Sequence, residues 1–86
     1  MEINAAIVRD DKFTFVVIIV KREVLENNFT KKQARDIFGK YFPLYPIVLM
    51  AQDASYNGIF DGPEDIVEYL SEVNIHKLPW STYTVK

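Results

Sequence analysis

The sequence contains no cysteine among its 86 residues and only one histidine. A chain without cysteine has no disulfide and no thiolate ligand or nucleophile, so packing or self-association must hold a domain of this size together. His76 has no second histidine or cysteine with which to build a familiar metal or nucleophile site. Glycine-rich phosphate loops and nucleophile-elbow motifs are also missing. We therefore expect a protein that is not an enzyme and that carries no cofactor.

Long apolar runs are absent as well. The run VVIIV is far shorter than the roughly 20 residues that a membrane-spanning helix needs. The opening residues, MEINAAIVRDD, have neither the basic start nor the apolar stretch of a secretory signal. A hydrophobic content of 49 % is ample for one packed core. We expect a single cytoplasmic domain over residues 1–86, with no membrane partner.

The first half of the chain predicts a hairpin followed by a helix. Residues 3–8 and 13–20 favour strands, and the turn sequence RDDK joins them. The second strand, FTFVVIIV, is apolar on both faces, which is typical of a strand in the middle of a sheet. Thr30 and Gln33 have the spacing of a capping box, which predicts a helix from Thr30 up to Pro43.

The second half predicts two strands, a helix and a last strand. Residues 46–51 read as a buried strand, and the Asn-Gly turn that follows favours a short strand beside it. Pro63 suits the first turn of a helix, whose apolar stripe continues to Val73. Residues 78–85 are rich in β-branched and aromatic types and predict the last strand.

The predicted order is β-β-α-β-β-α-β, an α+β chain. Without its first strand it resembles the ferredoxin-like fold, with its split β-α-β units. That resemblance implies a two-layer sandwich with an extra N-terminal strand and both helices on one face of the sheet. The other face of FTFVVIIV would then be a large bare apolar surface, which soluble monomers seldom show. We therefore expect a homodimer; the alternatives are that the first strand, a loop or another protein covers this face.

Charges are segregated along the chain. Residues 21–40 contain six bases and three acids, whereas residues 41–76 contain six acids and no lysine or arginine. Such asymmetry bears on partners rather than on fold. We predict partner-binding surfaces on both helices: Lys31, Lys32 and Arg35 on the first, and Glu64, Glu68 and Glu72 on the second. Binding of an unidentified protein is the favoured function; nucleic acid at the basic helix start is an alternative, disfavoured by the acidic pI.

Residues 53–64, DASYNGIFDGPE, match the spacing of a calcium loop. The candidate ligands are Asp53, Ser55, Asn57, Asp61 and Glu64. The strand-like sequence before the loop argues against it, because an EF-hand has a helix on each side. The same residue types also form ordinary turns and helix caps. Calcium or small-ligand binding is therefore a second hypothesis, and a turn followed by a capped helix is the favoured interpretation.

Overall fold

The computed structural model describes residues 2–52 and 58–84 and has the seven expected elements in succession, with two short helices added. In chain order the elements are β1 (Glu2–Arg9), β2 (Thr14–Ile19), α1 (Arg22–Leu25), α2 (Asn28–Tyr41), β3 (Ile47–Gln52), β4 (Gly58–Asp61), α3 (Glu64–Leu70), the 3-10 helix η1 (Ile75–Lys77) and β5 (Trp80–Thr84). The sequence did not suggest α1 or η1. The protein is a small α+β fold built on one mixed sheet.

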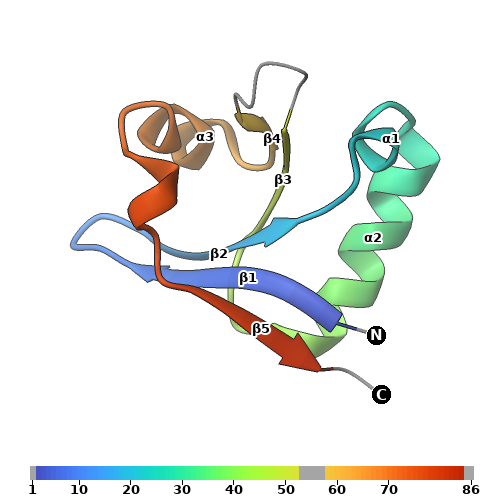
Figure 1. Cartoon of the computed structure of the whole chain (residues 1–86), viewed down its shortest axis with the longest axis horizontal. Coiled ribbons are helices and arrows are strands. Elements are labelled where there is room, and N and C mark those ends of the chain that lie inside the picture. The colour runs from blue at the N-terminus through green and yellow to red at the C-terminus, as the bar shows by residue number, and fades with distance from the viewer. Residues whose placement is uncertain (1, 53–57, 85–86) are drawn as a thin grey trace.

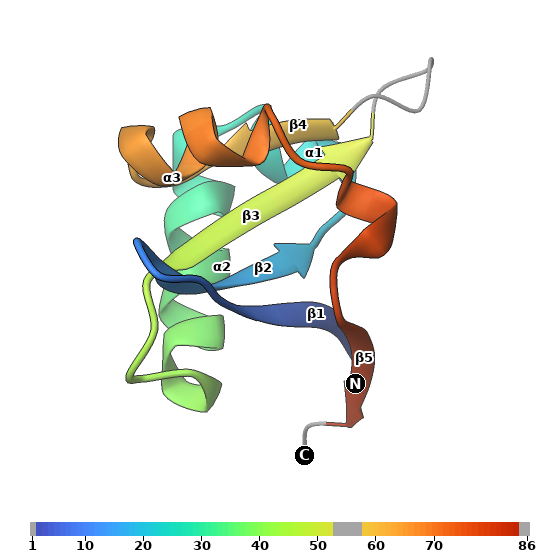
Figure 2. The same ribbon diagram turned by 90° about the vertical axis from the view of Figure 1, so that its left-hand side faces the viewer.

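The five strands lie in the order β4-β3-β2-β1-β5, which Figure 2 shows from top to bottom. β2 and β3 are parallel neighbours, and the other three pairs are antiparallel. The split β-α-β prediction is therefore wrong, because it requires a strand between β2 and β3. The N-terminal strand, β1, lies inside the sheet and not at its edge. A short turn joins β1 to β2, so β1 pairs with β2 as a hairpin and lies between β2 and β5.

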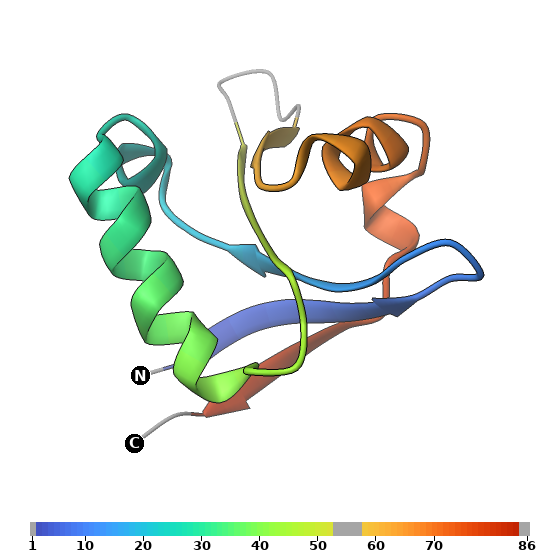
Figure 3. The same cartoon turned by 180° about the vertical axis from the view of Figure 1, so that it is seen from behind.

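The helices cover opposite faces of the sheet, as Figures 1 and 3 show with α2 and α3 on either side of the strands. Ile66 and Leu70 of α3 belong to the core on one face, together with Phe15 and Val17 of β2. Ala34 and Phe38 of α2 pack on the other core, which is centred on Val16, Ile18 and Leu49. The predictions of two layers and of both helices on one face are wrong. The molecule has a helical layer on each side of its sheet.

The strand β2 explains this arrangement. Phe15, Val16, Val17 and Ile18 all have 0 % of their surface exposed, so both faces of the strand are sealed by the chain itself. A strand with large apolar side chains on both faces gains most when each face is removed from water. The bare apolar face that motivated a homodimer does not exist. Self-association through that face has lost its physical basis.

The helix α2 begins earlier than the sequence suggested. Asn27 is its N-cap, and the Asn27 side chain accepts a hydrogen bond of 2.7 Å from the N–H of Phe29. Thr30, the predicted start, lies inside the helix, and its hydroxyl donates to the carbonyl of Val24 in α1 at 2.7 Å. Thr30 therefore ties the two helices together instead of capping one. None of the helices in residues 2–52 and 58–84 is long and apolar enough to cross a membrane.

Candidate functional site

Local sequence places the acidic side chains of α3 on its outer surface. The helix follows Pro63, and Glu64 and Asp65 occupy its first turn, where the helix dipole favours negative charge. Ile66 and Leu70, four residues apart, are 5 % and 1 % exposed and face the sheet. The helical period therefore turns Glu68 outward.

A shallow hollow of about 270 Å³ lies between α3 and the turn that joins β1 to β2. Its lining consists of three acids, two aromatic rings and one base: Asp65, Glu68, Glu72, Phe13, Tyr69 and Lys12. The carboxylates come from α3 and the turn after it, and the lysine comes from the hairpin turn. The acids thus gather around an aromatic surface.

Tyr69 holds this surface in place. Its ring lies 5.5 Å from that of Phe13, inclined by 58°, and packs edge-on against Phe15 at 6.1 Å. Its hydroxyl donates a 2.8 Å hydrogen bond to a carboxylate oxygen of Asp10, 59 residues away in the sequence. Asp10 also accepts a 3.0 Å bond from the backbone N–H of Lys12. The hairpin turn and α3 are therefore connected by both aromatic contact and hydrogen bonding.

These hydrogen bonds keep the Asp10–Tyr69 pair in a defined protonation state. The backbone N–H of Lys12 and the hydroxyl of Tyr69 lower the pKa of Asp10 below its usual 3.8. The Asp10 carboxylate in turn raises the pKa of Tyr69 above 10.0. Near neutral pH, Asp10 is an anion and Tyr69 is a neutral donor. Asp10 therefore adds a further negative charge beside the hollow.

The structure brings together two of the three predicted acids and adds another. Glu68 and Glu72 line the hollow and Glu64 does not, whereas Asp65, which was not among the predicted acids, lines it too. α3 ends at Leu70, so Glu72 lies in the following turn, where its N–H donates to the carbonyl of Tyr69 at 3.1 Å. The prediction that Glu64, Glu68 and Glu72 all lie on this helix is therefore wrong for Glu72.

The predicted basic surface on α2 is largely occupied by a contact within the chain. Arg35 donates to a carboxylate oxygen of Asp61 at 2.6 Å and to the carbonyl of Ile47 at 2.7 Å. It also donates to the carbonyl of Asp61, and the ammonium of Lys31 lies 3.6 Å from the other carboxylate oxygen. Only Lys32 of the three predicted bases has an exposed position without such an ion pair among the described residues.

This contact also bears on the calcium hypothesis. Burial raises the pKa of Asp61, but the hydrogen bond and positive charge of Arg35, with the charge of Lys31, outweigh it and leave the pKa lowered. Both carboxylate oxygens of Asp61 thus face cations of the chain itself. Asp53, Ser55 and Asn57 lie outside the described residues. Among residues 2–52 and 58–84, no three histidines or carboxylates are grouped as metal ligands usually are.

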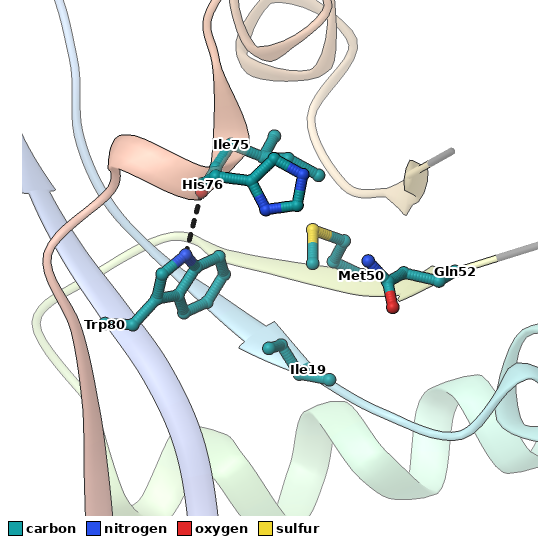
Figure 4. Close-up of a pocket in the computed structure, with 6 residues that line it drawn as sticks. All are labelled: Ile19, Met50, Gln52, Ile75, His76 and Trp80. Carbon is teal, nitrogen blue, oxygen red and sulfur yellow. Dashed lines mark hydrogen bonds between the residues drawn. The ribbon is translucent and has the colours of Figure 1, made fainter. Parts of the chain in front are cut away.

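A second hollow, of about 110 Å³, lies at the ends of β2 and β3. Figure 4 shows its six lining side chains, Ile19, Met50, Gln52, Ile75, His76 and Trp80. The indole N–H of Trp80 donates to the carbonyl of Ile75 at 2.8 Å, which fixes the ring against η1. The volume is well below the roughly 300 Å³ at which small-molecule sites usually begin. We therefore treat it as a packing feature.

The site residues predicted from the sequence do not include the two aromatic residues, Phe13 and Tyr69. Phe13 belongs to the predicted strand of residues 13–20, and Tyr69 directly follows Glu68, one turn after Asp65. An aromatic residue among several acids is a feature of the sequence that indicates such a site. The approach of Asp10 was not visible, because it depends on how the hairpin and α3 come together.

No known protein family, curated protein or solved structure matches this chain. The function of this chain must therefore be inferred from the geometry of its own residues.

Proposed function

We propose that this protein is a small, non-enzymatic interaction module whose hollow beside α3 binds a basic segment of a partner protein. The observation that carries the proposal is the lining itself. Three carboxylates line the hollow beside two rings in contact, and Lys12 is the one base in this lining. Asp10, bonded to Tyr69, adds a fourth carboxylate next to the rings.

The proposed ligand is the side chain of arginine or lysine in an extended peptide. Its aliphatic stem would pack on the rings of Phe13 and Tyr69, and its charge would meet the carboxylates of Glu68 and Glu72. Cations over aromatic rings gain roughly 0.5–1 kcal/mol at exposed sites, and hydrogen bonds to charged groups are stronger than neutral ones. A shallow, solvated hollow suits a weak and salt-sensitive contact.

The test is a titration of the protein with a short arginine-containing peptide, followed by amide NMR. We expect shifts at Lys12, Phe13 and Tyr69, and at least tenfold weaker binding of the Glu68→Gln variant. Glu64→Gln is the matched control, because it removes the same charge from the same helix but not from the hollow. Equal weakening in both variants would show that only the net charge matters. The same peptide with citrulline in place of arginine should not bind.

The charges favour this reading over nucleic-acid binding. Net charge is −2, and two of the three predicted bases, Lys31 and Arg35, already pair with Asp61. We do not propose that the expected homodimer acts through the charged helix faces, because Lys31 and Arg35 already pair with Asp61. Self-association is therefore proposed separately below, on another surface, and calcium binding at residues 53–64 remains a hypothesis for a calcium titration.

A further inference from the structure

The two edges of the sheet, β4 and β5, differ in how they are protected. β4 has four residues, and Arg35 of α2 reaches across to bond the carbonyl and the carboxylate of its last residue, Asp61. β5 has five residues, Trp80–Thr84, and pairs with β1. Within the described part of the chain, no second strand pairs with β5. A side chain of α2 thus bonds to the edge strand β4, whereas β5 has β1 as its one strand neighbour among the described residues.

The edge strand β5 presents hydrogen-bonding groups of the backbone. In an antiparallel ladder, alternate residues of an edge strand turn their N–H and C=O groups away from the neighbouring strand. Proteins usually guard such an edge with charged residues, proline or a bulge. The strand WSTYT contains neither charge nor proline, and its pairing with β1 runs without interruption over five residue pairs. Ser81, Thr82 and Thr84 are exposed.

We propose that β5 pairs with β5 of a second copy of this chain, antiparallel and about a two-fold axis at Thr82, to form one continuous ten-stranded sheet. The sequence of β5 favours a second copy of the same strand as its partner. In this register Thr82 lies opposite itself, Trp80 opposite Thr84 and Ser81 opposite Tyr83. No like charges meet, and pairs of threonine with threonine or aromatic residues are favourable across antiparallel strands.

Both cores would continue into the second copy. Trp80 packs against the core beneath α3, and Tyr83 packs against the core beneath α2. Tyr83 meets Phe42 edge-on at 5.4 Å, which sets its ring at the outer limit of that core. Both side chains are half-buried. A strand placed beside β5 would cover them further. This pairing uses the sheet edge and is independent of the hollow proposed to bind a basic segment.

The first test is the mass of the protein in solution across concentration. We expect a monomer–dimer equilibrium for the wild type and at least tenfold weaker dimerisation for Thr82→Lys, because two lysines would then face each other at the axis. Gln33→Lys is the control, since it adds the same charge on α2. Thr82→Val, which loses only the hydroxyl bond to Asn4, should still dimerise. A wild type that is monomeric up to millimolar concentration, or a dimer that Thr82→Lys leaves intact, overturns the proposal.

The second test uses the absence of native cysteine. Opposed residues in an antiparallel pair have Cα atoms about 4.5–5.5 Å apart, within reach of a disulfide. Thr82→Cys should therefore form covalent dimers under mild oxidation much faster than Gln33→Cys, with the circular dichroism of the wild type retained. Equal rates for the two variants would also overturn the proposal, and this result does not depend on whether the lysine variant folds.

Discussion

The helices α2 and α3 differ in what they do with their charges. The sequence presents them as equivalent, one basic and one acidic, each with an apolar stripe. In the structure, two bases of α2 are bound to Asp61, so that positive charge serves to attach the helix to the sheet. The acids around α3 line an exposed hollow with one lysine among them. A charged helix face is thus a recognition surface only if the fold leaves it without an internal partner.

The apolar contacts of the two helices differ in the same sense. None of the residues of α2, all of which the structure describes, is fully buried, whereas α3 buries Ile66 and Leu70 within a shorter length. α2 covers its face as a long helix with half-buried contacts, and Arg35 adds polar attachment. α3 is held mainly by two buried side chains. The predictions below test this contrast, in order of expected effect.

The largest effect should come from the buried anchor of α3. Leu70→Ala removes a side chain that is 1 % exposed, and we expect a loss of about 3 kcal/mol in the free energy of unfolding. Ile37→Ala on α2, where the side chain is 42 % exposed, should cost less than about 1 kcal/mol. Urea denaturation of both variants measures the difference. Equal losses would contradict the contrast between the helices.

A smaller effect should follow from Arg35→Lys. A lysine keeps the charge but cannot make the separate bonds to the carbonyls of Ile47 and Asp61, so we expect a loss of about 1–2 kcal/mol. Lys32→Ala, which removes an exposed base of the same helix, should change stability by less than about 0.5 kcal/mol. The same denaturation experiment compares them. Similar values would mean that Arg35 does not attach α2 to the sheet.

The ion pair should also appear in the pH dependence of stability. The pKa of Asp61 is lowered in the folded protein from 3.8, so its contribution is present above about pH 4 and is lost as pH falls through the folded pKa. The stability difference between the wild type and Asp61→Asn should therefore shrink on acidification. Thermal unfolding at a series of pH values measures it. Asp36→Asn, on the exposed side of α2, serves as the control for a general change in charge.

The smallest effect on stability should come from the acids of the hollow. Glu64 and Glu68 are four residues apart on α3, and like charges at that spacing cost a few tenths of a kcal/mol. Glu68→Gln should therefore leave stability unchanged or raise it by that amount while it weakens the binding of a basic peptide. A clear loss of stability would show that Glu68 is a structural residue and would count against the proposed function.

Much of the local structure could be predicted because it depends on neighbours in the chain. The nearly continuous apolar run FTFVVIIV predicted a central strand with two buried faces, and Pro63 predicted the start of α3. The predicted start of α2 at Thr30 is wrong, because Asn27 caps the helix and the Thr30 hydroxyl bonds to Val24 of α1 instead. Of the candidate site, the acids could be read from the sequence, but not which of them surround an aromatic surface.

The sequence by itself determined the succession of the five strands with α2 and α3, the two-sided burial of β2 and the separation of basic and acidic segments. Tertiary structure alone decided that β2 and β3 are neighbours, that α2 and α3 take opposite faces, and which charges are consumed within the chain. The physical reason is the distance along the chain over which each kind of interaction acts. Helical and strand periods act over a few residues, whereas Arg35 meets Asp61 across 26 residues and Tyr69 meets Asp10 across 59. Contacts over such distances exist only after the sheet has ordered its strands.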